Sequence, residues 1–198
     1  MDKIKGWHSR GYLPHFDTDQ RTQFVTIRLV DSLPEDALAR LKDEMRMRAA
    51  HGIDDLELQR RIERFLDTGY GACWLKRPEV AEVVESVLLD ADRDLFDLRG
   101  WVIMPNHAHI LLRPNAGISL SKIMQKIKGA SAYEANRVLG RTGAFWMRDY
   151  FDRYIRDHEH YLKAVKYIEQ NPVKARFCAD PAEWRFGSAW WTAQEDAN

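Results

Sequence analysis

Apolar and polar positions along the chain change between a period of two and a period of three to four, which predicts a mixture of strands and helices. Residues 23–30 alternate and are rich in β-branched side chains, so they predict a first strand, ended by a turn at 31–34. Apolar residues then recur at helical spacing through 34–45, 54–67 and 79–91, which predicts three helices in succession.

The second half of the chain has an equally regular pattern. Two apolar runs, 94–104 and 107–113, are interrupted only by Pro105-Asn106, which predicts adjoining antiparallel strands joined by a tight turn. An amphipathic helix is predicted over 119–139 and an aromatic, extended segment over 145–155.

A last long helix is predicted to begin at the capping residue Asp157 and to end near Asn171-Pro172, because the residue before a proline disfavours helical backbone. Beyond it we expect coil. The order strand, helix, strand, strand, helix, strand resembles a ferredoxin-like antiparallel sheet with helices packed on it. The sequence therefore predicts one α+β domain over residues 1–178 and an aromatic C-terminal extension over 179–198.

Composition indicates an ordered globular protein. Hydrophobic residues make up 45% and charged residues 30% of the 198 residues, which are ordinary values. No stretch approaches the ~18 uninterrupted apolar residues of a membrane span, the start has no apolar core of the signal-peptide kind, and two cysteines are too few for a disulfide framework. We therefore expect a cytoplasmic protein without membrane contact.

The net charge of zero conceals an uneven distribution. Residues 1–112 carry 16 Lys and Arg against 20 Asp and Glu, whereas residues 113–177 carry 13 against 6, a net charge of +7. Screening confines the field that a partner feels to roughly 10 Å, so a basic third of the chain can bind a polyanion even when the whole molecule is neutral. A solvated basic helix face would give the same count.

Two histidines, His107 and His109, lie two positions apart in the predicted strand 107–113. Successive side chains of a strand point to opposite faces, so both imidazoles project from the same face. A divalent metal ion would compensate for the hydration that they lose there, although two ordinary surface histidines would have the same spacing. No cysteine or histidine cluster stands nearby to complete a closed zinc site, which favours an open site completed by oxygen ligands.

Three separated motifs resemble one family of proteins. The segment 101–112, WVIMPNHAHILL, resembles the His-hydrophobic-His strand of the single-tyrosine HUH transposases. Segments 149–157 and 167–175, together with 6–15, GWHSRGYLPH, resemble the ending and the start typical of REP-associated tyrosine transposases. One departure is Ala108, where the family usually has a bulky residue. The resemblance implies the HUH endonuclease fold.

The resemblance also implies the chemistry of a few residues. The family's nucleophile is a helix tyrosine, and the position that matches it is Tyr167, which would form a covalent 5′-phosphotyrosine with DNA. A phenol with a pKa of about 10 is a weak nucleophile at neutral pH, so it needs a metal ion that polarises the phosphate. The implied ion is Mg²⁺ or Mn²⁺, held by His107 and His109. Asn171 matches the position that completes the metal shell in the wider family, with Glu169 and Gln170 as alternatives.

Without the resemblance, the residues allow other interpretations of the site. Without the resemblance, Tyr167 is a packing residue on an apolar helix face, and three other tyrosines compete for the role of nucleophile: Tyr150, Tyr154 and Tyr161. The basic block offers candidates for contacts with DNA phosphates, namely Lys122, Lys126, Lys128, Arg148, Arg153, Arg156, Lys163 and Lys174. The resemblance adds Arg10 and His15, near the N-terminus, for reading the bases beside a hairpin.

The function that the resemblance implies is a metal-dependent DNA transposase and endonuclease, which nicks and rejoins single-stranded, hairpin-bearing DNA of the REP type. The partner would be that DNA, the enzyme would work as a monomer or a homodimer, and it would be associated with the nucleoid. A relaxase or replication initiator with the same chemistry is the alternative enzyme, but those usually carry a third metal histidine and often paired tyrosines. A catalytically silent hairpin-binding protein and a protein-interaction module are the alternatives from other classes.

Overall fold

A four-stranded antiparallel sheet forms the centre of the molecule. The computed structural model describes residues 6–9, 14–17, 20–37, 39, 40, 43 and 56–196, with side chains from residue 20 onward except at 56–60. The strands are β3 (Gln23–Arg28), β4 (Phe96–Met104), β5 (His107–Pro114) and β6 (Phe151–Tyr154), in the order β4-β5-β3-β6. All neighbours are antiparallel. This is the ferredoxin-like order, so the predicted α+β class is confirmed.

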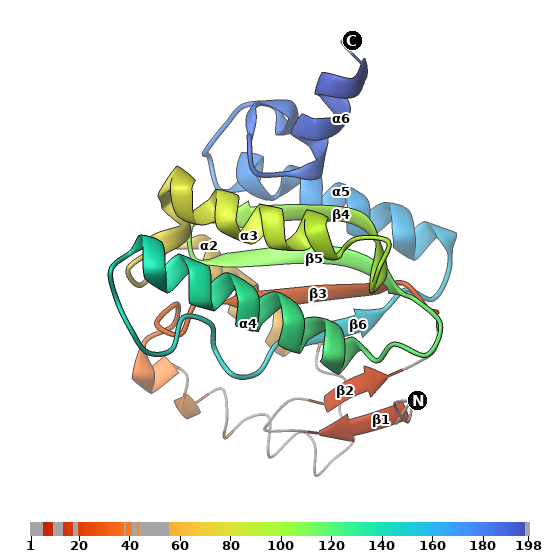
Figure 1. Ribbon diagram of the computed structural model, residues 1–198, viewed down its shortest axis with the longest axis horizontal. Helices are drawn as coiled ribbons and strands as arrows, with labels where there is room; N and C mark the ends of the chain where they lie inside the picture. The colour runs from red at the N-terminus through yellow and green to blue at the C-terminus, as the bar shows by residue number, and fades with distance from the viewer. Residues whose placement is uncertain are drawn as a thin grey trace.

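The helices cover both faces of this sheet (Figure 1). In chain order they are α2 (Leu56–Asp67), α3 (Pro78–Ala91), α4 (Leu120–Val138), α5 (His158–Lys174) and α6 (Ser188–Asp196), with short 3-10 helices η1 (Trp74–Lys76) and η2 (Pro181–Glu183). A separate two-stranded hairpin, β1 (Gly6–Ser9) with β2 (Pro14–Asp17), precedes the sheet. The described residues include no helix that is long and apolar enough to cross a membrane.

Alternation along the strands separates two hydrophobic clusters. Ile27 of β3 and Ala108 and Ile110 of β5 pack in the larger cluster with the buried residues of α3 and α4. Phe24 of β3 and Leu111 of β5 point the other way and pack with residues of α5. Successive side chains of a strand point to opposite faces, so His107 and His109 lie on the α5 face.

Most of the predicted elements are confirmed, with bounds that differ by a few residues. Ser119 and Asp157 cap α4 and α5, because each side chain accepts a hydrogen bond from a backbone N–H of the first turn. Helix α5 continues to Lys174 with the buried Pro172 inside its last turn, so the predicted end near Asn171 is a few residues too early. Of the helix predicted over 34–45, residues 35–37, 39, 40 and 43 are helical and the remainder lies outside the described residues.

The coil predicted after α5 is wrong, because η2 and α6 follow it. The segment leading into α6 lies along β4: the Ile103 N–H donates to the Phe186 carbonyl at 2.8 Å, and Trp184 Nε1 donates to the Ile103 carbonyl at 3.0 Å. This segment covers the edge of β4, which would otherwise expose unpaired backbone groups. The C-terminal tryptophans therefore pack on the domain, and the boundary between 178 and 179 stays a prediction.

A buried carboxylate holds that segment in place. Glu85 of α3 is 3% exposed and accepts hydrogen bonds from the indole N–H groups of Trp101 and Trp191, at 3.3 and 3.0 Å. Arg185 completes the cluster with an ion pair to Glu85 at 2.9 Å. A buried charge is tolerated only when it is paired and hydrogen-bonded, and Glu85 has both kinds of partner.

Candidate active site

The histidine pair lies in the middle of the sheet, on β5. His107 is 1% exposed and His109 is fully buried, and their ring centroids are 4.7 Å apart. Ala108 between them faces the larger hydrophobic cluster on the other side of the sheet. The prediction that both imidazoles share one face therefore agrees with the structure, but they lie in the interior rather than at a surface.

Each imidazole is fixed by a hydrogen bond at Nδ1. His109 Nδ1 lies 2.8 Å from the Thr26 hydroxyl on β3, and His107 Nδ1 lies 2.8 Å from Asn106 Oδ1. Asn106 donates its own amide N–H to the Tyr70 carbonyl, which leaves its oxygen to accept from His107. Such contacts fix the ring orientation and direct the other nitrogen toward a ligand. Both Nε2 atoms are buried and have no hydrogen-bond partner among the described residues.

Burial keeps both rings neutral. It lowers the pKa of His107 to about 3, and it lowers that of His109 well below the ordinary value, with smaller effects from His107 and Lys174. An imidazole binds a metal ion through the lone pair of its neutral form. The pair is thus in the protonation state that metal coordination requires at any pH near neutrality.

Helix α5 brings two more polar side chains to the pair. Tyr167 and Asn171 lie one helical turn apart, and the ring of Tyr167 has its centroid 5.2 Å from that of His109. Asn171 is 2% exposed, and its Oδ1 is a third buried atom without a hydrogen-bond partner within the described part of the chain. The same part contains no group of three His, Cys, Asp or Glu residues placed so that they could hold a metal ion. The donor atoms present are thus two imidazole nitrogens and one amide oxygen.

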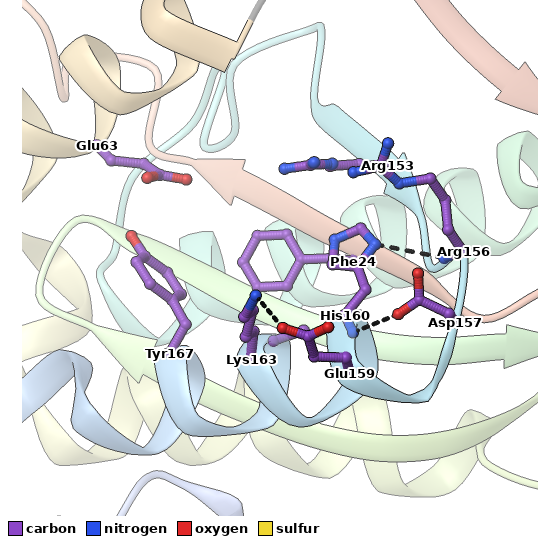
Figure 2. Close-up of a pocket in the computed structure, with 10 residues that line it drawn as sticks. Phe24, Glu63, Arg153, Arg156, Asp157, Glu159, His160, Lys163 and Tyr167 are labelled. Atoms are coloured by element: carbon purple, nitrogen blue, oxygen red, sulfur yellow. Dashed lines mark hydrogen bonds and ion pairs between the residues drawn. The ribbon is translucent and has the colours of Figure 1, made fainter.

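The phenol of Tyr167 meets a carboxylate that the sequence analysis did not single out. Glu63 of α2 accepts a hydrogen bond from Tyr167, and Figure 2 shows its carboxylate facing the hydroxyl end of the ring. Burial raises the pKa of Tyr167 far above its ordinary value, and the charges of Glu63 and Asp67 raise it further, while a hydrogen bond from Asn171 lowers it. The side chain of Tyr167 is therefore a neutral phenol at pH values near neutrality.

A cavity of about 540 Å³ opens beside Tyr167, between α2, α5 and β6 (Figure 2). It holds three cationic side chains and three carboxylates, over an aromatic wall formed by Phe24 and Tyr167. Its lining is completed as follows: Glu63, Arg153, Arg156, Asp157, Glu159, His160, Lys163 and Ala164. The size lies within the range of roughly 300–1,000 Å³ that is typical of sites for small organic ligands.

The structure separates the predicted DNA-contact residues into two groups. Arg153 lines the cavity, and Lys174 Nζ lies 4.8 Å from the centroid of the Tyr167 ring. Lys122 and Lys126 are exposed on α4, across the sheet from Tyr167, and Arg148 is exposed in the loop before β6. Arg10 lies outside the described residues, and of His15 only the backbone in β2 is described.

The residues that compete with Tyr167 for the role of nucleophile, and with Asn171 for the role of metal ligand, are placed differently. Tyr150 is 7% exposed and packs in the larger cluster on the opposite face of the sheet. Tyr154 lies under the guanidinium of Arg21, and Tyr161 stacks on His158. Glu169 and Gln170 are half-buried on α5, without the unpartnered buried oxygen that Asn171 has.

Comparison with known proteins shows what the chain as a whole is similar to. A curated relative, a REP-associated tyrosine transposase of Escherichia coli (strain K12), is 24% identical over 109 residues, which are 54% of this chain and 63% of the relative. The aligned part thus spans less than two thirds of that relative's length. A solved structure of a REP-associated tyrosine transposase bound to a REP hairpin superposes with a TM-score of 0.55 and 17% identity, over 88% of this chain and 79% of the other.

That likeness shows that the two proteins share a fold. A putative transposase from Deinococcus radiodurans is more distant, with a TM-score of 0.36 and 14% identity over 83% of this chain and 96% of the other. The sequence pattern of the family described as "Transposase IS200 like" matches residues 73–171, half of the chain. The matched range contains His107, His109 and Tyr167 and ends at Asn171. The chain belongs to the IS200-like transposase family.

Proposed function

We propose that this chain is a metal-dependent single-strand DNA endonuclease and strand transferase, which acts on hairpin-bearing DNA through a covalent 5′-phosphotyrosine at Tyr167. The observation that carries the proposal is the set of three buried, unpartnered atoms beside Tyr167: Nε2 of His107, Nε2 of His109 and Oδ1 of Asn171. Leaving a buried polar atom unpaired costs about 1–3 kcal/mol, so three together call for a ligand.

The donor atoms fit a divalent ion in an open site. Two neutral imidazoles and an amide oxygen would leave positions for water and phosphate oxygens, and such a mixed set should bind Mn²⁺ more tightly than Mg²⁺. When bound, the ion would polarise the scissile phosphate and withdraw charge in the transition state. No closed zinc site of four protein ligands is required.

The side chains of the protein perform the remaining steps. Tyr167 Oη attacks phosphorus while the bond from phosphorus to the 3′ oxygen breaks, which leaves a free 3′ hydroxyl. Glu63, which already accepts the phenol hydrogen bond, takes the proton and can return it to the departing oxygen. Asn171 orients the phenol through its own hydrogen bond. The phosphotyrosine ester retains the bond energy, so a 3′ hydroxyl can rejoin the strand by the reverse attack.

The choice of DNA as substrate rests on the family and on charge. A curated relative is a REP-associated tyrosine transposase, and the solved structure with the same fold holds a REP hairpin. Residues 113–177, which include α4 and α5, carry the net charge of +7. The substrate that we propose is therefore a REP-type hairpin with a single-stranded flank, cut in the cytoplasm, where nucleoid DNA would supply it.

The proposal is tested by trapping the covalent adduct. Hairpin oligonucleotides labelled at the 3′ end would be incubated with the protein and Mn²⁺ or Mg²⁺, and the label would be followed on a denaturing gel. We expect a protein-linked label with the wild type that disappears with EDTA, with Tyr167→Phe and with His109→Ala.

Tyr161→Phe is the matched control, because Tyr161 lies on the same helix but stacks on His158 away from the histidine pair. It should form the adduct at the wild-type rate. If the wild type binds the hairpins without forming an adduct under any metal, the protein is a hairpin-binding protein and the catalytic proposal is wrong. If it neither binds nor cleaves DNA, both are wrong.

A further inference from the structure

The cavity beside Tyr167 extends away from the histidine pair, along α5. From Tyr167 it reaches the first turn of the helix at His160, a distance of about 10 Å for seven residues of α-helix. Phe24 forms part of its aromatic wall, and the Phe24 ring packs edge-to-face on the Tyr167 ring with the two centroids 5.7 Å apart. The adduct chemistry uses Tyr167 and Glu63 at one end and leaves the rest of the cavity without an assigned role.

Three cationic side chains reach this cavity and could contact phosphate groups. Arg153 enters from β6, Arg156 from the turn before α5, and Lys163 from the helix itself (Figure 2). The carboxylates in the lining are engaged by protein donors: Asp157 accepts from the His160 N–H at 2.7 Å, and Glu159 pairs with Lys163 at 2.6 Å. Glu63 accepts the phenol hydrogen bond.

The pKa of His160 responds to these neighbouring charges. Burial lowers its pKa, and the charges of Arg153, Arg156 and Lys163 each lower it further, whereas Asp157 raises it. At this imidazole three cationic side chains thus act against the one carboxylate of Asp157. Together with the apolar wall of Phe24, this provides the two features that single-stranded nucleic acid binds to, cations for phosphate and an aromatic surface for a base.

The direction of the reaction decides which nucleotide this is. In a phosphoryl transfer the attacking and leaving oxygens lie roughly in line on opposite sides of phosphorus. The nucleotide that carries the leaving 3′ oxygen therefore departs from the side opposite Tyr167. The strand that keeps the 5′ phosphate stays bonded to Tyr167, so its first nucleotide is tethered next to the cavity that Tyr167 lines.

We infer that this cavity binds the first nucleotide on the 3′ side of the cut, with its base against Phe24 and the following phosphate between Arg153 and Arg156. This inference rests on the proposed function and adds a subsite to it. Such a subsite would hold the covalent strand while the 3′ end is exchanged for another, which is what strand transfer requires.

The test uses a probe that needs no knowledge of the cut site. A 5′-phosphorylated trinucleotide of mixed sequence with a 3′ fluorophore would be titrated with wild-type protein in EDTA and followed by fluorescence anisotropy. Arg156→Ala should weaken binding about tenfold, the loss of one charge-assisted hydrogen bond. It should also reduce the slope of log affinity against log salt concentration by about 0.7. Replacing the first base by an abasic residue should weaken binding about 5- to 100-fold.

Arg99→Ala is the matched control, because Arg99 is an exposed arginine on β4, the strand at the other edge of the sheet from β6. It should bind as the wild type does, and melting curves would show that both variants are folded. The subsite is refuted if the probe does not bind, if Arg156→Ala and Arg99→Ala behave alike, or if the abasic probe binds equally well.

The two proposals fail separately. An adduct with hairpin DNA, combined with arginine-independent binding of the probe, would leave the catalytic proposal standing and overturn the subsite. Arginine- and base-dependent binding of the probe without any adduct would show that the cavity binds a nucleotide, but it would overturn the catalytic proposal and with it the assignment of that nucleotide to the 3′ side of a cut.

Discussion

Acid should destabilise the metal-free protein through its two buried histidines. Burial lowers the pKa of His107 to about 3 and that of His109 well below its ordinary value, whereas both should titrate near pH 6.5 in the unfolded chain. Between these limits the unfolded state binds more protons than the folded state. The free energy of unfolding therefore rises with pH in this window, and it falls as the pH drops below about 6.5.

The size of this loss depends only on the pKa of each histidine in the unfolded chain, as long as its pKa in the folded protein stays below the pH of measurement. At pH 5.0 each histidine would lower the free energy of unfolding by about 2 kcal/mol relative to pH 7.5. This pH lies 1.5 units below the unfolded pKa of about 6.5, and each unit contributes about 1.4 kcal/mol. Two histidines together would cost about 4 kcal/mol, a large part of the 5–15 kcal/mol that is typical of a folded domain.

Urea unfolding in EDTA at pH 7.5, 6.0 and 5.0 would measure this dependence. The double variant His107→Gln, His109→Gln should lose about 4 kcal/mol less than the wild type between pH 7.5 and pH 5.0, and each single variant about 2 kcal/mol less. His158→Gln is the control, because that side chain is exposed in the folded protein. Equal acid sensitivity of the wild type and the double variant would refute the neutral, buried pair on which the proposed metal site depends.

Three further predictions concern metal binding and packing. Mn²⁺ at 100 times its Kd should stabilise the protein by about 2.7 kcal/mol and raise the Tm by about 5–10 °C in a thermal shift assay, and Asn171→Leu should lose most of that rise. Gly71→Ala should cost at least about 2 kcal/mol in urea unfolding, since φ is +93° and the new Cβ would lie 2.5 Å from the Asp31 carbonyl oxygen; Gly143→Ala, with φ of +95° and open space, should cost only about 1 kcal/mol. Glu85→Ala should cost about 3 kcal/mol and speed hydrogen exchange in α6, and Glu85→Gln should do less of both, because an amide still accepts the indole hydrogen bonds. Equal costs for Gly71→Ala and Gly143→Ala would contradict the close contact with Asp31. Equal costs for Glu85→Ala and Glu85→Gln would contradict the indole hydrogen bonds.

The sheet and its helices could be predicted because their signals are local. Strands β4 and β5 are two apolar runs interrupted only by Pro105-Asn106, and α4 and α5 begin at residues that cap helices well. Hairpin β1-β2 was missed because each of its strands is four residues long, which is too short for a period to be recognised.

The C-terminal segment was predicted as coil for a different reason. Its position depends on contacts with parts of the chain that are distant in sequence, such as the hydrogen bond from Trp184 to Ile103 and the ion pair from Arg185 to Glu85. No local pattern carries that information. The tryptophans could be expected to pack, but not against which surface.

The site was predicted in part. Spacing placed the histidines on one face, and the resemblance to a family selected Tyr167, but nothing in the sequence paired it with Glu63, which comes from a helix much earlier in the chain. Asn106 was interpreted only as a turn residue, although its side chain also holds His107. The basic residues were predicted as one group because charge can be counted along a chain, whereas the face of the sheet on which each lies depends on packing.

The alternation along β5 couples correct folding to activity. Ala108 and Ile110 belong to the hydrophobic cluster on one face, and His107 and His109 belong to the site on the other. A shift of one residue in the pairing of β5 with β3 would keep a ladder of backbone hydrogen bonds, but it would turn the imidazoles into the hydrophobic cluster and the aliphatic side chains toward Tyr167. Molecules with this wrong register would thus lose the packing of the core and the contacts of Tyr167 together. The fraction of a preparation that forms the adduct should therefore report the fraction in which this strand has paired correctly.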